Sequence, residues 1–223
     1  MITLFKIIIG TTIGSFLSLV SVRSNRHESI IFPPSHCDYC HHRLSAWEMI
    51  PIISFILLKG RCSHCRKPIG IINLEAEIIG GLIVGTNPIR VNGILETGFE
   101  LILLLLALDD WQSFKMPSGI ILTLAGIGVV QLIKFQNLNW LVIAAEIMSY
   151  LIILKANSSD RLIGNGDVDV IFIILLKTNL LTTAIVILIA SSTALIKFLI
   201  TRNSKTIPFI PYLTFGYLAV NLL

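Results

Sequence analysis

Two groups of acidic residues, far apart in the sequence, have surroundings that suit catalysis. Asp167 ends the segment 164–167, at the point where a polar stretch meets the apolar run 168–176. Asp109 and Asp110 end another apolar run. An ionisable residue at the edge of such a run is costly to leave without a partner, so function is the first hypothesis for it. We therefore expect Asp167 to pair with one of the two upstream acids.

Two carboxylates held close together can hydrolyse a peptide bond. One ionised carboxylate takes a proton from water, while a protonated partner polarises the carbonyl group. Because two like charges disfavour double ionisation, such a pair carries one proton. Gly164 and Gly166, which flank Asn165, are expected to give the chain backbone shapes denied to other residues and to let a substrate strand approach. The pattern predicts an aspartyl pair that includes Asp167.

Each acid also has a structural explanation. Asp167 stands at a predicted helix start, where an aspartate serves as an N-cap. Asp109 and Asp110 stand at a predicted helix end, where they would be solvated, although the helix dipole disfavours acids there. A further alternative is a membrane protein without enzymatic activity, such as a zinc-anchored assembly factor or a transporter. Such a protein would use the two aspartates as a proton relay.

All four cysteines lie in two Cys-X-X-Cys segments, Cys37 with Cys40 and Cys62 with Cys65. Each short turn offers two thiolates to one ion, so the two turns together suit a tetrahedral zinc site. The 21 residues between them slightly exceed the usual spacing. Redox dithiols are the alternative, and a reducing cytoplasm argues against structural disulfides. The five histidines lie in the same stretch, but four cysteines already complete a structural zinc site.

Composition places these groups in a membrane protein. Of the 223 residues, 54% are hydrophobic and only 13% are charged, whereas about 25% are charged in an average soluble domain. A membrane span needs about 20 apolar residues. The predicted fold is therefore all-α, a polytopic bundle of about eight transmembrane helices with one small loop domain. The net charge of +4 is no sign of a nucleic-acid partner, because it follows from the loop distribution described below.

Eight apolar segments are expected to span the bilayer: 1–22, 71–85, 93–108, 118–133, 139–154, 168–176, 180–200 and 207–223. Gly10 and Gly14 predict that another helix approaches the first span closely. Glu96 and Glu100 share one face of the third span, which predicts a buried polar seam. The apolar run 50–58 is too short to span, so it is expected to pack under the cysteine turns or to lie on the bilayer surface.

The basic residues predict the orientation in the membrane. Lys6, Arg90, Lys134 and Lys177 fall on one side of the expected spans, and the other thirteen of the seventeen Lys and Arg residues fall on the other. The positive-inside rule makes the richer side cytoplasmic. The expected domains are a first transmembrane helix (1–22), a cytoplasmic four-cysteine zinc-binding domain (23–70) and a membrane-embedded peptidase domain (71–223). Asp110 and Asp167 then emerge together at the cytoplasmic face.

These motifs together resemble the type IV prepilin peptidases, the leader peptidase family of bacterial membrane-embedded aspartic proteases. The segment 164–167 is similar to the GxGD motif that this family shares with presenilin-type proteases. Asp110 stands seven residues before Pro117, as the family's first catalytic aspartate does before its proline. The resemblance therefore assigns Asp110, rather than Asp109, as the partner of Asp167. It also places Glu75 where the family has a glutamate after the cysteine domain.

The resemblance implies cleavage of prepilin or pseudopilin leaders at the cytoplasmic face of the cell membrane, just before the apolar helix of the substrate. It also implies methylation of the new N-terminus with S-adenosylmethionine, although no glycine-rich cofactor loop supports this from the sequence itself. The compact size resembles the Gram-positive competence type, which processes the pseudopilins of a DNA-uptake apparatus. One residue departs from the pattern: Asp169 stands where the family usually has lysine, which is expected to alter substrate contacts.

Overall fold

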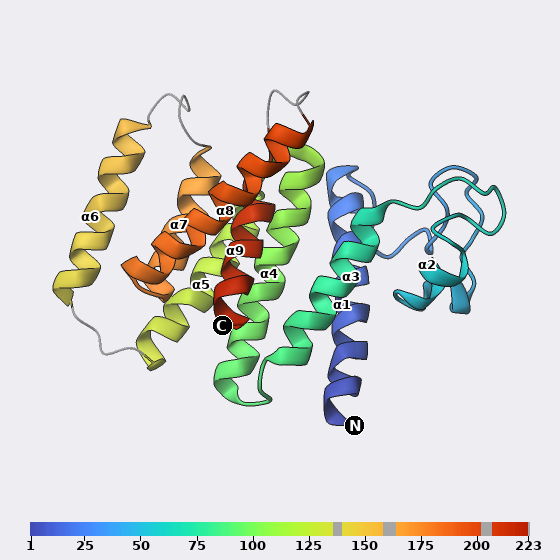
Figure 1. Cartoon of the computed structure of the whole chain (residues 1–223), viewed down its shortest axis with the longest axis horizontal. Helices are drawn as coiled ribbons and strands as arrows, with labels where there is room; N and C mark the ends of the chain where they lie inside the picture. Colours follow the sequence, from blue (N-terminus) through green and yellow to red (C-terminus); the bar gives the residue numbers. More distant parts are fainter. Residues whose placement is uncertain (136–139, 158–163, 202–206, 223) are drawn as a thin grey trace. The chain divides into compact units, whose positions relative to one another are not determined.

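The computed structural model describes residues 1–135, 140–157, 164–201 and 207–222, and most of these are helical (Figure 1). The described residues form no β-strand, and the two isolated β-bridges join His36 to Arg43 and Arg61 to Pro68. The predicted all-α class is therefore confirmed. The side chain of Lys134 and residue 139, where the fifth span is expected to begin, lie outside the described residues. The chain divides into two compact units, Met1–Asn87 and Pro88–Leu223.

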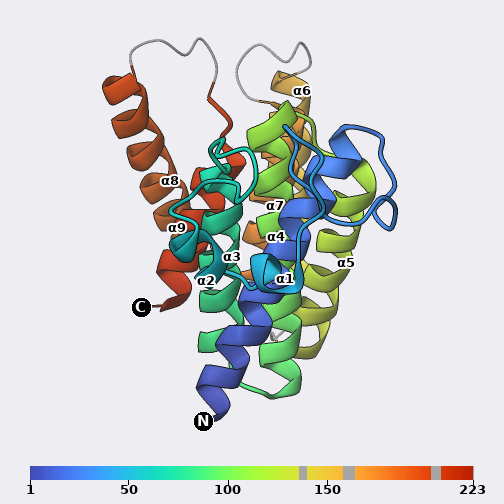
Figure 2. The ribbon, with the colours of Figure 1, turned by 90° about the vertical axis from the view of Figure 1, so that its right-hand side faces the viewer.

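The first unit is built on two helices, α1 (Ile2–Asn25) and α3 (Ile71–Thr86), which lie side by side in Figures 1 and 2. Glycines allow their backbones to touch. A Cβ atom on Gly10 would lie 2.3 Å from the carbonyl oxygen of Gly80, and one on Gly14 would lie 2.1 Å from that of Ala76. The close helix contact predicted from Gly10 and Gly14 is therefore confirmed.

Polar side chains on these apolar helices find partners within the unit. The hydroxyl of Ser18 donates to Oδ1 of Asn73 at 2.5 Å, and that of Ser15 donates to Oε1 of Glu77 at 2.8 Å. The other oxygen of Glu77 accepts a 2.7 Å hydrogen bond from the backbone N–H of Ile52. Since an unsatisfied polar group is costly in an apolar environment, these bonds stabilise the helix pair. Through Ile52, Glu77 also links the loop between α1 and α3 to this helix pair.

The loop between α1 and α3 contains two short helices, η1 (Ala46–Met49) and α2 (Ile53–Leu57). Glu48 caps the start of η1. Its carboxylate accepts hydrogen bonds from the hydroxyl of Ser45 at 2.6 Å and from the backbone N–H of Ser45 at 2.8 Å. The Ser45 hydroxyl lowers the pKa of Glu48 to about 2, with a further contribution from Ser63. Glu48 is therefore ionised at neutral pH and links the short helix to the second cysteine turn.

The apolar run 50–58 has two kinds of side chain. Ile50, Ile53, Ile56 and Leu57 are exposed, as is the preceding Trp47. Ile52, Phe55 and Leu58 are half-buried, and the ring of Phe55 lies against Gly60, beside the second cysteine turn. Packing under the cysteine turns and a position on the bilayer surface both stay predictions for this run. An exposed apolar patch of this kind marks a contact with a membrane or another partner.

The described residues of the second unit form six helices: α4 (Val91–Ser113), α5 (Ser118–Phe135), α6 (Trp140–Ala156), α7 (Asn165–Lys177), α8 (Leu180–Thr201) and α9 (Ile210–Leu222). Helix α4 packs against α5 and α9, α7 packs against α5 and α6, and α8 packs against α9. The core is fully buried and draws on several helices, with Phe99 and Leu103 from α4, Ile174 from α7 and Leu213 and Tyr217 from α9. This packing holds the ends of α4, α7 and α9 in place.

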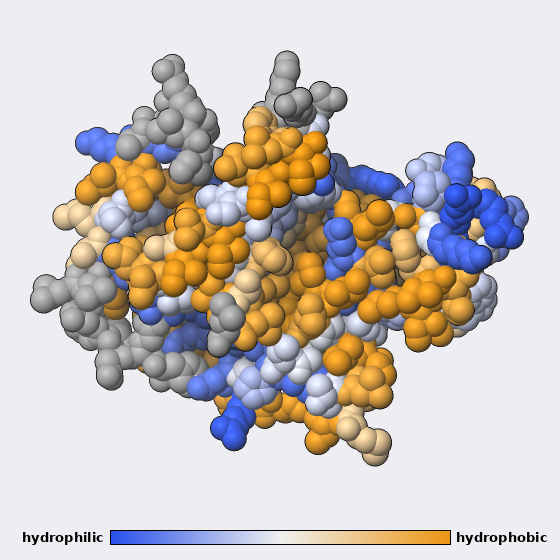
Figure 3. All heavy atoms as spheres, viewed as in Figure 1, coloured by the Kyte–Doolittle hydropathy of each residue, from blue (hydrophilic) through white to orange (hydrophobic). Residues whose placement is uncertain are grey.

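The exterior of these helices is that of a membrane protein. Among the described helices, Ile2–Asn25, Val91–Ser113 and Leu180–Thr201 are long and apolar enough to cross a bilayer. Helix α8, with 22 residues, is about 33 Å long and matches a hydrocarbon core of about 30 Å. Its outward side chains, such as Leu188, Leu195 and Phe198, are apolar and exposed. On the face shown in Figure 3, hydrophobic residues cover much of the second unit.

Candidate active site

Asp109 and Asp110 lie near the end of α4 and are both buried, with only 2% and 3% of their surfaces exposed. They are therefore not solvated acids at a helix end. Oδ2 of Asp110 accepts a 3.1 Å hydrogen bond from the backbone N–H of Ile210, the first residue of α9. The start of a helix presents N–H groups without intrahelical acceptors and the positive end of its dipole. Helix α9 thus orients the carboxylate of Asp110.

Asp167 is the third residue of α7, and the N-cap of that helix is Gly164. The interpretation of Asp167 as an N-cap is therefore wrong. Its Oδ1 atom is buried and has no hydrogen-bond partner within the described part of the chain. Since a buried oxygen without a donor is costly, this atom is well suited to bind a water molecule or a substrate group.

The fold brings the two predicted aspartates together. The end of α4 supplies Asp110 and the first turn of α7 supplies Asp167, and the side chains are close enough for the charge of Asp110 to act on Asp167. Both belong to the second unit. Asp110 is buried, and Asp167 is partly buried with its Oδ1 atom removed from solvent. A pair of interacting carboxylates in such surroundings has the properties that proton sharing and water activation require.

The two glycines of the motif have a different role from the predicted one. Gly164 has an ordinary extended backbone (φ −60°, ψ 137°), and Gly60 is the only described glycine with positive φ. The expectation of special backbone shapes at Gly164 and Gly166 is therefore wrong. The requirement is space: a Cβ on Gly166 would lie 2.6 Å from Sδ of Met116, and one on Gly164 would lie 3.2 Å from Oδ2 of Asp167.

The four cysteines form a cluster in the first unit. Their sulfur atoms all lie within 4.8 Å of one another, with 3.8 Å between Cys37 and Cys65 and 3.9 Å between Cys40 and Cys62. Four thiolates at about 2.3 Å from one tetrahedral zinc ion are themselves about 3.8 Å apart. The arrangement therefore fits zinc, which would join the two turns as a structural ion.

The two cysteine turns have the same local structure. In each, the first cysteine donates its backbone N–H at 2.9 Å to a carbonyl oxygen five residues later, from Cys37 to His42 and from Cys62 to Lys67. The residue before that acceptor has positive φ in both, 55° at His41 and 61° at Arg66. This repeated shape directs all four thiols to one point. The histidines lie outside this cluster, and His42 stacks on His64 with ring centroids 5.0 Å apart.

Glu75 lies on α3 in the first unit, and its side chain is exposed. Its role as a supporting residue remains a prediction. The neighbouring Glu77 is the buried acid of this pair and makes the hydrogen bonds described above. Its position three residues before Gly80 places it on the face of α3 that meets α1, and this periodicity is the signal that distinguishes it from Glu75.

The second unit also contains a polar cluster that the sequence only partly predicts. The seam expected from Glu96 and Glu100 is confirmed, because Glu96 accepts hydrogen bonds from Tyr217 at 2.6 Å and Asn221 at 2.9 Å, and Asn221 donates to Glu100 at 3.0 Å. Lys177, however, is expected in the turn after the sixth span, on the outer side of the membrane. In the structure it is the last residue of α7 and is buried. It forms a 2.5 Å ion pair with Glu96.

Comparisons with known proteins agree with the motifs. Residues 8–91 match the family described as the Bacterial Peptidase A24 N-terminal domain. The chain is 31% identical over 175 residues to a prepilin leader peptidase/N-methyltransferase of Burkholderia pseudomallei (strain 1026b), covering 63% of this chain and 56% of that protein. It is 32% identical over 119 residues to the protein of that name from Bacillus subtilis (strain 168), covering 52% and 48%.

The chain thus spans about half the length of these two curated relatives. A shorter match, 37% identical over 79 residues, relates it to the prepilin leader peptidase/N-methyltransferase of Myxococcus xanthus (strain DK1622), with 35% of this chain and 24% of that protein covered. No solved structure matches the chain. The resemblance to type IV prepilin peptidases predicted from the motifs is confirmed by these relatives.

Proposed function

We propose that this chain, a relative of the type IV prepilin peptidases, is a membrane-embedded aspartic endopeptidase that uses Asp110 and Asp167 as its catalytic pair. The observation that carries the proposal is the proximity of the buried carboxylate of Asp110, at the end of α4, to the partly buried carboxylate of Asp167, at the start of α7. The relatives are named prepilin leader peptidases. The proposed substrates are therefore the leaders of prepilins or pseudopilins.

The chemistry follows from a pair that shares one proton. The ionised carboxylate removes a proton from a water molecule, whose oxygen attacks the peptide carbonyl carbon, while the protonated carboxylate gives its proton to the carbonyl oxygen. The resulting tetrahedral species breaks its carbon–nitrogen bond as the nitrogen gains a proton. The products are a leader with a new carboxyl group and a mature protein with a new amine. The Ile210 N–H holds one oxygen of Asp110 during these steps.

The remaining assignments belong to the same proposal. Gly164 leaves room beside Asp167, and Gly166 leaves room for the side chain of Met116. Glu75 is proposed as a supporting residue from the family resemblance alone. In functional terms, residues 1–22 are a membrane helix, residues 23–70 a zinc domain and residues 71–223 the peptidase domain. The excess of basic residues predicts that the catalytic pair and the zinc domain face the cytoplasm.

Two cofactors are proposed. Zinc would be held by Cys37, Cys40, Cys62 and Cys65, whose sulfur spacing fits it. Its role is structural, because four thiolates leave no open position for substrate. The names of the relatives include N-methyltransferase, so we extend the proposal to methylation of the new N-terminal amine by S-adenosylmethionine. No residue of this chain is assigned to that second reaction.

The test is co-expression with a prepilin-like substrate, followed by mass spectrometry of the substrate's N-terminus. Asp110→Asn and Asp167→Asn keep the shape of each side chain but remove the shared proton. Each is expected to lower cleavage by about 10²–10⁴-fold. Asp38→Asn, which removes an exposed acid in the first unit, is the control and is expected to cleave normally. Undiminished cleavage in either dyad variant would disprove the proposal and favour the proton-relay alternative.

A further inference from the structure

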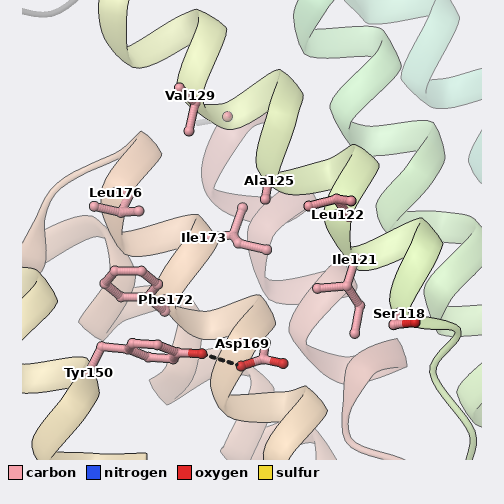
Figure 4. Close-up of a pocket in the computed structure, with 11 residues that line it drawn as sticks. Ser118, Ile121, Leu122, Ala125, Val129, Tyr150, Asp169, Phe172, Ile173 and Leu176 are labelled. Atoms are coloured by element: carbon pink, nitrogen blue, oxygen red, sulfur yellow. Dashed lines mark hydrogen bonds between the residues drawn. The ribbon is translucent and has the colours of Figure 1, made fainter.

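A cavity of about 340 Å³ lies between α5, α6 and α7 (Figure 4). Its size is at the lower end of the range for small-ligand sites. Ser118, Tyr150 and Asp169 line it toward one end, and the remaining lining is apolar, with Val129 and Leu176 toward the other end. The cavity is therefore a narrow apolar space with a single carboxylate among its lining residues.

The carboxylate of Asp169 is held in place. Oδ1 accepts a 2.6 Å hydrogen bond from the hydroxyl of Tyr150, and the ring of Tyr150 stacks on Phe172 with centroids 4.2 Å apart. The ion pairs of the described residues join Arg26 to Asp38 and Lys177 to Glu96, so none of them includes Asp169. A neutral hydroxyl orients a carboxylate but does not balance its charge. The cavity thus presents negative charge that no described residue neutralises.

The polar end of the cavity lies close to the catalytic pair. Asp169 follows Asp167 by two residues on α7, which places it about 3 Å further along the helix and about 200° around it. The polar end of the cavity therefore flanks the start of α7 on the side away from Asp167, and the apolar part runs along α7 to Leu176. A peptide chain that passes around this end of α7 contacts the pair on one side and the cavity on the other.

We propose that this cavity binds one basic side chain of the substrate leader, with Asp169 as its counter-ion. The inference rests on the proposed peptidase function and names a determinant of its specificity. Lysine and arginine combine an apolar stem with a charged head, which is the same combination of apolar wall and fixed carboxylate that the cavity offers. The basic residue lies on the leader side of the cleaved bond, since the other side is an apolar helix.

The geometry also sets the distance of this residue from the cleaved bond. A helix with its side chains is about 10 Å wide, and an extended chain advances about 3.3 Å per residue. Reaching from Asp167 around the start of α7 to Asp169 therefore takes about three to five residues. The cavity is specific for a basic residue three to five positions before the cleavage site.

The test measures binding separately from cleavage. Full-length Asp110→Asn protein in phosphatidylcholine nanodiscs binds fluorescent peptides that contain the leader and the start of the apolar helix. Each peptide carries one lysine at a different leader position and is compared with a norleucine peptide, which keeps the stem and lacks the charge. Lysine three to five positions before the cleavage site is expected to bind about tenfold more tightly than norleucine. Lysine outside this window is expected to bind like norleucine.

Substitutions at Asp169 then identify the counter-ion. Asp169→Asn is expected to abolish the lysine preference without weakening binding of the norleucine peptide, which also shows that the variant is folded. Asp169→Lys is expected to favour glutamate at the same leader position. Glu146→Gln is the matched control, because Glu146 is a carboxyl group on α6 one turn before Tyr150 that does not line the cavity. It is expected to retain the preference.

Two binding results would overturn the inference: equal binding of the lysine and norleucine peptides at every position, or a lysine preference that survives Asp169→Asn. A third result would also overturn it: peptide charge has no effect on binding, and phosphatidylethanolamine co-purifies with the unsubstituted protein but not with Asp169→Asn. In the last case the cavity holds a lipid. Active protein that cleaves lysine and norleucine peptides equally overturns the inference and leaves the peptidase function intact. Charge-selective binding by protein that never cleaves overturns the peptidase function alone.

Discussion

The backbone N–H of Ile210 donates a 3.1 Å hydrogen bond to Oδ2 of Asp110. This bond joins the end of α4 to the start of α9, and it is reinforced by the packing of Leu213 and Tyr217 in the core shared by these helices. The orientation of the first proposed catalytic carboxylate therefore depends on a helix near the other end of the sequence.

Asp110 and its neighbour Asp109 are expected to differ in their effect on cleavage. Both are buried, but the Ile210 contact is made by Asp110, and the charge that acts on Asp167 is also that of Asp110. Asp109→Asn is expected to keep cleavage within about tenfold, while Asp110→Asn loses about 10²–10⁴-fold. Initial cleavage rates in detergent provide the comparison. Equal losses would show that the assignment of Asp110 over Asp109 is wrong.

The cysteine cluster is expected to hold about one zinc ion per chain, measured by plasma mass spectrometry of purified protein. Cys62→Ser removes a ligand and is expected to lose most of this zinc and to make the loop sensitive to protease. His64→Ala is the control, because this exposed histidine lies outside the cluster, and it is expected to keep the ion. Unsubstituted protein that contains no zinc would contradict the proposed site.

Adding a single methyl group at Gly14 is expected to destabilise the contact between α1 and α3. Gly14→Ala places its Cβ 2.1 Å from the carbonyl oxygen of Ala76, so the helices must separate. The expected loss is about 1–3 kcal/mol of unfolding free energy. Gly70→Ala is the matched control, because no atom lies within 4 Å of a Cβ there. Thermal unfolding in detergent compares the two, and equal stability would mean that α1 and α3 do not meet at Gly14.

The partly buried ion pair between Lys177 and Glu96 is expected to show strong coupling. Lys177→Met leaves the carboxylate of Glu96 without its cation in a low-dielectric environment and is expected to cost about 3 kcal/mol. Lys177→Met combined with Glu96→Gln removes both charges and is expected to restore much of this loss. Unfolding titrations of the two single variants and the double variant measure the coupling. Additive effects would indicate that the two charges do not interact.

Local and periodic features of this chain are predictable from sequence. The apolar segments identify the helices, the spacing of Gly10 and Gly14 identifies a close helix contact, and the paired cysteines identify the cluster, because each signal lies within a few residues. The burial of Lys177 and the orientation of Asp110 are different. Their partners, Glu96 and Ile210, are 81 and 100 residues away. Only the tertiary packing of the second unit, in which α4 packs against α5 and α9 and α5 packs against α7, brings these groups together.

The motif glycines show a second limit of prediction from sequence. Gly164 and Gly166 suggest an unusual backbone, yet Gly164 has ordinary angles and Gly166 lies within α7. The same residue type serves either for conformational freedom or for lack of volume. Here the deciding contacts come from Met116 and from the side chain of Asp167, and neither can be read from the motif itself.

The pairing of Glu96 with Lys177 has a consequence for synthesis of the protein. Glu96 is the sixth residue of α4, and the lysine that pairs with it is made 81 residues later. An acid within a membrane helix is costly to leave without a partner. Until translation reaches the end of α7, this end of α4 must therefore stay beside the insertion machinery or in contact with water.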